Sequence, residues 1–296
     1  MPLLPFRPAA WRGYLELLRP ANVATALADV LAGYAVTDLG APRALALLLV
    51  STACLYAGGI AFNDFFDRSV DAIERPERPI PSGRVPPGAA ALVASTLLVL
   101  GVLFAWLASS TAGAVSVAIV ASVVIYDAWG KRRSLIGPIN MGLCRGLNLT
   151  LGMAAVPGVV SGHWALGLLP LVYIAGVTLV SRGEVHGGTR RASAVALALV
   201  GLVVAASATL AFLGPGSRTG ALIAAAVLAW QVLPAFSRAV RRPVPDVIGA
   251  AVRMGVLSLV LLDAVIAAAY AGIIYTLAVV LTALLAGRLS RLVAVT

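Results

Sequence analysis

Long apolar segments separated by short polar stretches run through almost the whole chain. A transmembrane α-helix needs about 20 mostly apolar residues, and most of these segments reach that length. Because the first, fourth and last are short or interrupted, the pattern predicts nine to ten membrane helices. Lipid cannot satisfy backbone hydrogen bonds, which favours an all-α bundle. The expected helices cover residues 21–36, 44–63, 89–109, 112–129, 137–158, 164–181, 193–213, 219–238, 246–268 and 271–287.

The composition supports a membrane location. Hydrophobic residues make up 60% of the chain and charged residues 11%, whereas a soluble domain has about 25% charged residues. We therefore expect an integral membrane protein in which residues 1–296 form a single domain. Two polar loops, 64–88 and 181–192, interrupt the apolar pattern, and residues 9–19 predict a short helix at the membrane surface.

Basic residues divide unequally between the two ends of the expected helices. Of 22 lysines and arginines, 18 fall on one side, only Arg43 and Arg218 on the other, and Arg145 and Arg253 inside expected spans. The positive-inside rule then places both termini and both polar loops on the cytoplasmic side of the cell (inner) membrane. This topology and contact with anionic lipid explain the net charge of +10, so nucleic acid is not an expected partner.

Acidic residues gather where the second expected helix ends. The chain has 12 acidic residues, and five of them fall within 64–77. Asn63, Asp67 and Asp71 are spaced i, i+4, i+8 and share one helix face, with Asp64 at its edge. Several hard oxygen ligands on one face suit a magnesium ion that holds a phosphorylated substrate. A solvated helix end is the alternative, but acidic residues oppose the usual positive border of a membrane helix.

A basic stretch rich in proline follows these acids. It contains Arg75, Arg78 and Arg84. The planar guanidinium group matches the geometry of phosphate oxygens better than an ammonium group does. A loop of this kind, stiffened by proline, can close over a diphosphate.

These motifs resemble those of the UbiA superfamily of intramembrane prenyltransferases. Asn63, Asp67 and Asp71 meet its first signature, NxxxDxxxD, and residues 75–84 are similar to the basic pattern that follows it. The stretch from 18 to 22 resembles the opening R-P-x-N of the superfamily. Residues 126–148 look like its middle basic loop and the span after it. The resemblance covers most of residues 11–192.

The resemblance implies an enzyme that uses Mg2+ to ionise an isoprenyl diphosphate and joins the isoprenyl group to an aromatic or other small acceptor. Pyrophosphate is released, and the active site would face the cytoplasm. By the same resemblance, the metal is expected to be bound by Asn63, Asp64, Asp67 and Asp71. The diphosphate is expected to contact Arg75, Arg78, Lys131, Arg145 and Arg182. The acceptor is expected to contact Asn22, Tyr126, Asn148 and His186.

The second polar loop departs from the pattern of the superfamily. A second acidic motif, roughly D-x-x-D-x-x-G-D, is expected after the sixth span, but residues 181–188 read Ser-Arg-Gly-Glu-Val-His-Gly-Gly. Only Glu184 remains of the three acids, and we expect it to complete the catalytic and metal-binding set. His186 adds a side chain that titrates near neutral pH. This form of the loop resembles an EboC-like branch of the superfamily. An ordinary connecting loop is the alternative.

Several polar residues lie inside expected spans, where they usually face the interior of a helical bundle. Asp29 is expected to pair with Arg145 or to help bind the acceptor, and a purely structural pair is an equal alternative. Arg253 and Asp263 are expected to pair with other helices. Residues expected to belong to the core are Cys54, Cys144, Met141 and Met153.

Two further functions stay open beside prenyl transfer. The loss of acids from the second motif is compatible with a membrane terpene cyclase of similar fold, in which the cation is captured internally. Charged helix ends, and a polar loop that follows a span in each half of the chain (64–88 and 181–192), are also expected of a transporter or a non-catalytic lipid binder. The complete first motif favours metal-dependent chemistry.

Overall fold

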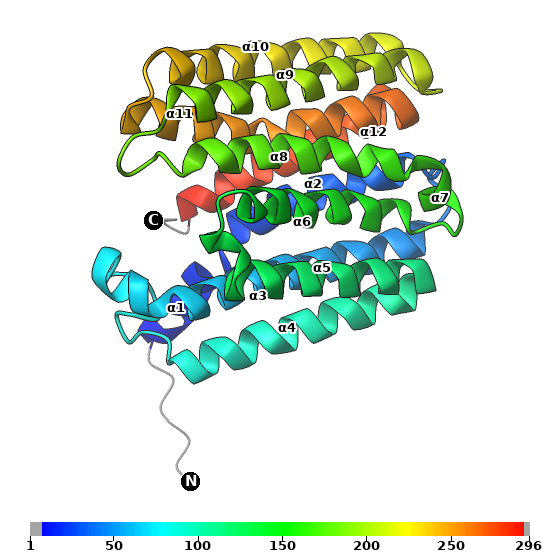
Figure 1. The fold of residues 1–296 in the computed structure, drawn as a ribbon. Helices are drawn as coiled ribbons and strands as arrows, with labels where there is room; N and C mark the ends of the chain where they lie inside the picture. Colours follow the sequence, from blue (N-terminus) through cyan, green and yellow to red (C-terminus); the bar gives the residue numbers. More distant parts are fainter. Residues whose placement is uncertain (1–7, 293–296) are drawn as a thin grey trace.

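The computed structural model describes residues 8–292, and within that range all regular structure is helical. Arg7, which contributes to the expected charge asymmetry, lies outside the described residues. The helices pack side by side with their long axes roughly aligned (Figure 1). Helix α1 and the last part of α12 lie at the same end of the bundle. This arrangement is compatible with termini on one side of a membrane, and the cytoplasmic side stays a prediction.

The first half of the chain contains six α-helices and a short 3-10 turn. Their bounds are α1 Pro8–Leu18, α2 Pro20–Ala35, α3 Pro42–Glu74, α4 Pro87–Ala108, α5 Ser110–Ala128, η1 Gly130–Arg132 and α6 Ile136–Met153. The second half continues with α7 Val159–His163, η2 Trp164–Gly167, α8 Leu168–Ser181, α9 Arg190–Leu213, α10 Arg218–Arg241, α11 Pro245–Leu257 and α12 Leu259–Leu292.

Local sequence explains where many of these helices begin. Proline opens α2, α3, α4 and α11, in the first turn, where its missing N–H would have no partner within the helix. The side chains of Ser109, Thr189 and Ser217 each accept a hydrogen bond from the first turn of the helix that follows. The predicted surface helix at 9–19 corresponds to α1.

Seven segments of the described chain are long and apolar enough to cross a membrane. Helices α2 and α6 fall short of that criterion, but both lie inside the bundle. Gly272 has a φ of 82° and interrupts α12 close to the boundary that the hydrophobic pattern placed between 246–268 and 271–287. The prediction of an all-α membrane bundle is therefore confirmed. The expected loop 64–88 is shorter in the structure, because α3 continues to Glu74.

Glycines bring α6 against two other helices. A methyl group at Gly33 of α2 would meet the backbone of Leu149, and one at Gly152 would meet the backbone of Val30. On the opposite side of α6, Gly142 approaches the backbone of α8 equally closely. Close backbone contact through small residues is the usual packing of membrane helices. It fixes the position of α6, which carries part of the candidate site.

Candidate active site

Three aspartates on the last turns of α3 are paired with basic residues. Asp64 and Asp71 are buried. Nη1 of Arg78 lies 2.7 Å from Oδ2 of Asp71 and 3.3 Å from Oδ1 of Asp64. Arg19 donates a second contact to Asp64, at 2.7 Å. The structure thus brings together Asp64, Asp71 and Arg78, as the sequence motifs predict, and adds Arg19 from the start of α2.

Arg19 reaches Asp64 from a turn of unusual backbone conformation. Its φ is 43° and its ψ is 66°, a left-handed conformation that is uncommon for residues other than glycine. The turn joins α1 to α2 and directs the arginine toward α3. Arg19 belongs to the opening R-P-x-N motif, yet sequence reasoning gave it no role at the site.

Lys131 connects the α3 motif with the end of α5. Its Nζ atom lies 2.7 Å from Oδ1 of Asp67 and 3.7 Å from Oδ1 of Asp127. Asn63 donates a hydrogen bond of 2.6 Å from Nδ2 to the same oxygen of Asp127. Asp127 is buried, and it is not among the residues that the motifs predict for the site. A signal was present, because Asp127, like Asp64, is an acid at the end of an apolar span.

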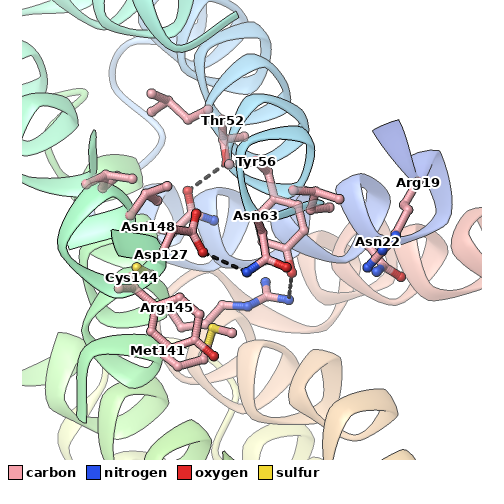
Figure 2. A pocket seen from close by; sticks show the side chains of 16 residues that line it. Arg19, Asn22, Thr52, Tyr56, Asn63, Asp127, Met141, Cys144, Arg145 and Asn148 are labelled. Atoms are coloured by element: carbon pink, nitrogen blue, oxygen red, sulfur yellow. Dashed lines mark hydrogen bonds between the residues drawn. The ribbon is translucent and has the colours of Figure 1, made fainter. Parts of the chain in front are cut away.

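A cavity of about 260 Å3 opens beside these groups, between α2, α3, α5 and α6. Figure 2 shows Asn63 and Asp127 on its wall, with Tyr56, Arg145 and Asn148 near them. Apolar side chains supply much of the remaining wall, including Leu55, Ile60, Ile119 and Val123. Three residues predicted to contact the acceptor line this cavity: Asn22, Tyr126 and Asn148. Met141 and Cys144, expected in the core, line it as well.

A buried ion pair supports the wall formed by α6. Nη1 of Arg145 lies 2.8 Å from Oδ2 of Asp29, which also accepts a hydrogen bond from Asn148. The second terminal nitrogen of Arg145 donates to the hydroxyl of Tyr56 at 2.9 Å. Asp263 of α12 lies beside the pair. The expected pairing of Asp29 with Arg145 is therefore present, and a contact of Arg145 with diphosphate stays a prediction.

The second polar loop contributes less to the cavity than the sequence predicted. Glu184 and His186 of this loop are exposed, and neither lines the cavity. The same holds for Arg75 of the first polar loop. Partial desolvation raises the pKa of Glu184, while the positive charges of Arg253 and Arg75 act in the opposite direction. Arg182 lies with Lys131 and Tyr126 in a second, more open cavity of about 320 Å3. It donates a hydrogen bond to the backbone oxygen of Arg133.

The donor set at the end of α3 fits magnesium by its chemistry. All of its side chains offer hard oxygen atoms, which Mg2+ prefers. Within the described residues, no group of three His, Cys, Asp or Glu side chains is arranged to hold a metal. Mg2+ is usually bound by one or two carboxylates together with substrate phosphates and water, so a complete protein cage is not required.

Comparison with known proteins identifies the family. The model of the UbiA prenyltransferase family matches residues 23–247. A digeranylgeranylglyceryl phosphate synthase from Methanopyrus kandleri is 34% identical over 197 residues, which cover 57% of this chain and 72% of that protein. Further synthases of that name match over 53 to 76% of their own length. The chain belongs to the UbiA prenyltransferase family.

Solved structures share the fold. A structure of digeranylgeranylglyceryl phosphate synthase superposes with a TM-score of 0.69 at 21% identity, covering 89% of this chain and 99% of that chain. A UbiA homologue from Archaeoglobus fulgidus, bound to GPP and Mg2+, gives a TM-score of 0.62 at 17% identity, covering 90% and 99%. At this level of identity the likeness concerns the fold alone.

Proposed function

We propose that this chain is a magnesium-dependent prenyltransferase that transfers an isoprenyl group from its diphosphate to a small acceptor and releases pyrophosphate. The observation that carries the proposal is the grouping of Asp67 with Lys131, and of Asp71 with Arg78, beside a largely apolar cavity. A diphosphate bound with magnesium requires carboxylates that bind the metal and basic groups that bind the phosphate oxygens.

In the proposed reaction, the bond between the isoprenyl carbon and the diphosphate oxygen breaks, and the electron pair leaves with pyrophosphate. Bound magnesium would supply charge stabilisation to that leaving group. Lys131 and Arg78 would add fixed positive charge in a site of low dielectric constant. The acceptor then forms the new bond to carbon and releases a proton.

The cavity wall would protect the cation formed in this reaction. Leu55, Ile60 and Val123 provide apolar surface that excludes water. Tyr126 and Asn148 are the polar groups proposed to orient the acceptor. The related synthases are named for a glyceryl phosphate product, so we extend the proposed acceptors from aromatic compounds to glyceryl phosphate lipids.

The test is pyrophosphate release by the purified protein supplied with geranyl, farnesyl or geranylgeranyl diphosphate. Each donor is tested with magnesium and with EDTA, and with a hydroxybenzoate or a glyceryl phosphate lipid as acceptor. Release that requires magnesium and acceptor, with formation of the prenylated acceptor, supports the proposal. Asp67→Asn and Asp71→Asn should abolish it. No release from any donor, despite measurable donor binding, would instead favour a lipid binder or transporter.

A cyclase of the same fold is the second candidate. It is favoured by the exposed second loop, in which Glu184 is the only acid and lies outside the cavity. A cyclase would release pyrophosphate without any acceptor and yield a cyclic hydrocarbon. Analysis of the organic product from donor alone separates the two candidates.

A further inference from the structure

Asp127 is a buried carboxylate at the last turn of α5, opposite the first motif. It lines the cavity, and neither the metal-binding nor the diphosphate-binding set includes it. Its Oδ1 atom is the shared partner of Asn63 and Lys131, at 2.6 and 3.7 Å. A single side chain from α5 therefore contacts two residues that are expected to bind different parts of the substrate complex.

The hydrogen bond to Asp127 determines how the amide of Asn63 is oriented. An ionised carboxylate accepts hydrogen bonds but cannot donate them. Asn63 must therefore direct its amino group toward Asp127, as the contact from Nδ2 shows (Figure 2). Within residues 8–292, the only side-chain hydrogen bond of Asn63 is the one that its amino group donates to Asp127, which leaves the carbonyl oxygen without a donor there. Of the two polar atoms of the amide, the one that stays available is the one that a hard cation can use.

We infer that Asp127 is a positioning residue that fixes the Asn63 amide with its carbonyl oxygen available as a ligand for a hard divalent cation. The inference rests on the proposed function and adds a requirement to it. Without Asp127, the amide can rotate and present its amino group, which cannot bind a cation. Partners that orient a metal ligand in this way typically change metal affinity by about 10- to 100-fold when they are removed.

The interaction with Lys131 gives Asp127 a second, weaker contact. The lysine is closer to Asp67 than to Asp127, at 2.7 against 3.7 Å. Loss of Asp127 therefore leaves Lys131 its nearer partner but leaves Asn63 without its acceptor. The metal-binding step is consequently the step that should respond most to a change at Asp127.

The experiment measures binding of Mn2+ in the presence of inorganic pyrophosphate, by electron paramagnetic resonance of the purified protein in detergent. Asp127→Leu removes the acceptor while keeping the branched shape of the side chain, and it should raise the half-saturating Mn2+ concentration by about 10- to 100-fold. The double variant Asn63→Asp/Asp127→Asn exchanges donor and acceptor while keeping one oxygen available for the cation. It should restore half-saturation to within about threefold of the unmodified protein.

Three outcomes would overturn the inference. In the first, the unmodified protein binds Mn2+ and Asp127→Leu binds it with the same affinity. The proposed function would then stand. In the second, the double variant is as weak as a correctly folded Asp127→Leu. In the third, the unmodified protein does not bind Mn2+ with pyrophosphate, which would overturn the proposed function as well. Thermal unfolding without metal monitors folding. If Asp127→Leu does not fold, the double variant is compared with Asn63→Asp alone. Tighter Mn2+ binding by the double variant supports the inference, and equal or weaker binding overturns it.

Discussion

The Nζ atom of Lys131 lies 2.7 Å from Oδ1 of Asp67. Sequence reasoning assigns these residues to different partners, the lysine to the diphosphate and the aspartate to the metal. Their contact means that each neutralises the other before substrate binds. In the proposed function, Lys131 would exchange Asp67 for a diphosphate oxygen, and Asp67 would exchange Lys131 for the magnesium ion, so neither charge would be left without a partner.

Replacement of Lys131 by methionine should weaken donor binding. The change would remove the charge-assisted contact to the diphosphate that we propose for Lys131, which corresponds to about 10- to 100-fold in dissociation constant. Binding of a farnesyl diphosphate analogue with magnesium, measured by calorimetry, tests this expectation. Arg132→Met is the matched control, because Arg132 is the exposed neighbour and its replacement should leave binding within about twofold. Equal effects of both variants would contradict a specific role for Lys131.

Asp64→Asn and Asp67→Asn should differ in their effects on stability. The Asp64 carboxylate is buried between two arginines, so its loss leaves Arg19 and Arg78 without this partner. We expect a decrease of roughly 2 to 3 kcal/mol in unfolding free energy, below the full value for a buried pair because Arg19 is partly exposed. The Asp67 side chain is 30% exposed, and without it Lys131 keeps Asp127 as a partner, so Asp67→Asn should cost no more than about 1 kcal/mol. Denaturant unfolding in detergent compares the two.

Arg145→Met should destabilise the bundle, whereas Asp263→Asn should not. Asp29 and Asp263 both lie beside Arg145 inside the bundle, but only Asp29 forms an ion pair with it among residues 8–292. Removal of the arginine leaves buried acids without a cation, which we expect to cost about 3 to 5 kcal/mol. Removal of the second acid should be neutral or stabilising. Thermal unfolding distinguishes these cases, and a large loss from Asp263→Asn would refute the view that one acid is in excess.

Glu184→Gln should alter the magnesium concentration needed for pyrophosphate release much less than Asp127→Leu. Glu184 is exposed and lies outside both cavities. The positive charges of Arg253 and Arg75 act on it, which suits a contact between loops better than a metal ligand. We expect the magnesium concentration that half-saturates pyrophosphate release to change by less than about threefold. Replacement of a residue that orients a metal ligand typically changes metal affinity by about 10- to 100-fold. A change of 100-fold would show that the second loop binds metal despite its missing acids.

Gly33→Ala should destabilise the bundle. The added methyl group would overlap the backbone of Leu149, which cannot move without displacing α6. Overpacking of this kind typically costs about 1 to 3 kcal/mol. Gly162→Ala provides the control, since nothing lies within 4 Å of the added carbon. The melting temperatures of the two variants should therefore differ by several degrees, with the Gly33 variant lower.

The sequence predicts the fold well because lipid restricts the possible structures. Apolar length places most of the helices, but the break at Ser258, which separates α11 from α12, lies inside the expected helix 246–268. The sequence also predicts the grouping on α3, because Asn63, Asp67 and Asp71 belong to one helix with a fixed period. Contacts between helices follow no such local rule. Asp127 and Arg19 lie far from Asn63 and Asp64 in sequence, and only the packing of α2, α3 and α5 brings them together.

The basic loop after α3 is already folded against the bundle. Ile80 and Val85 are buried in a small cluster with residues of α1, α3 and α4. Val85 donates a backbone hydrogen bond to Pro79, and Arg84 binds Glu16 of α1 at 2.6 Å. Ordering a free loop around a ligand loses conformational entropy and weakens binding. Here that entropy is lost during folding, so a diphosphate would meet a preorganised wall, and more of the intrinsic contact energy would be expressed as affinity.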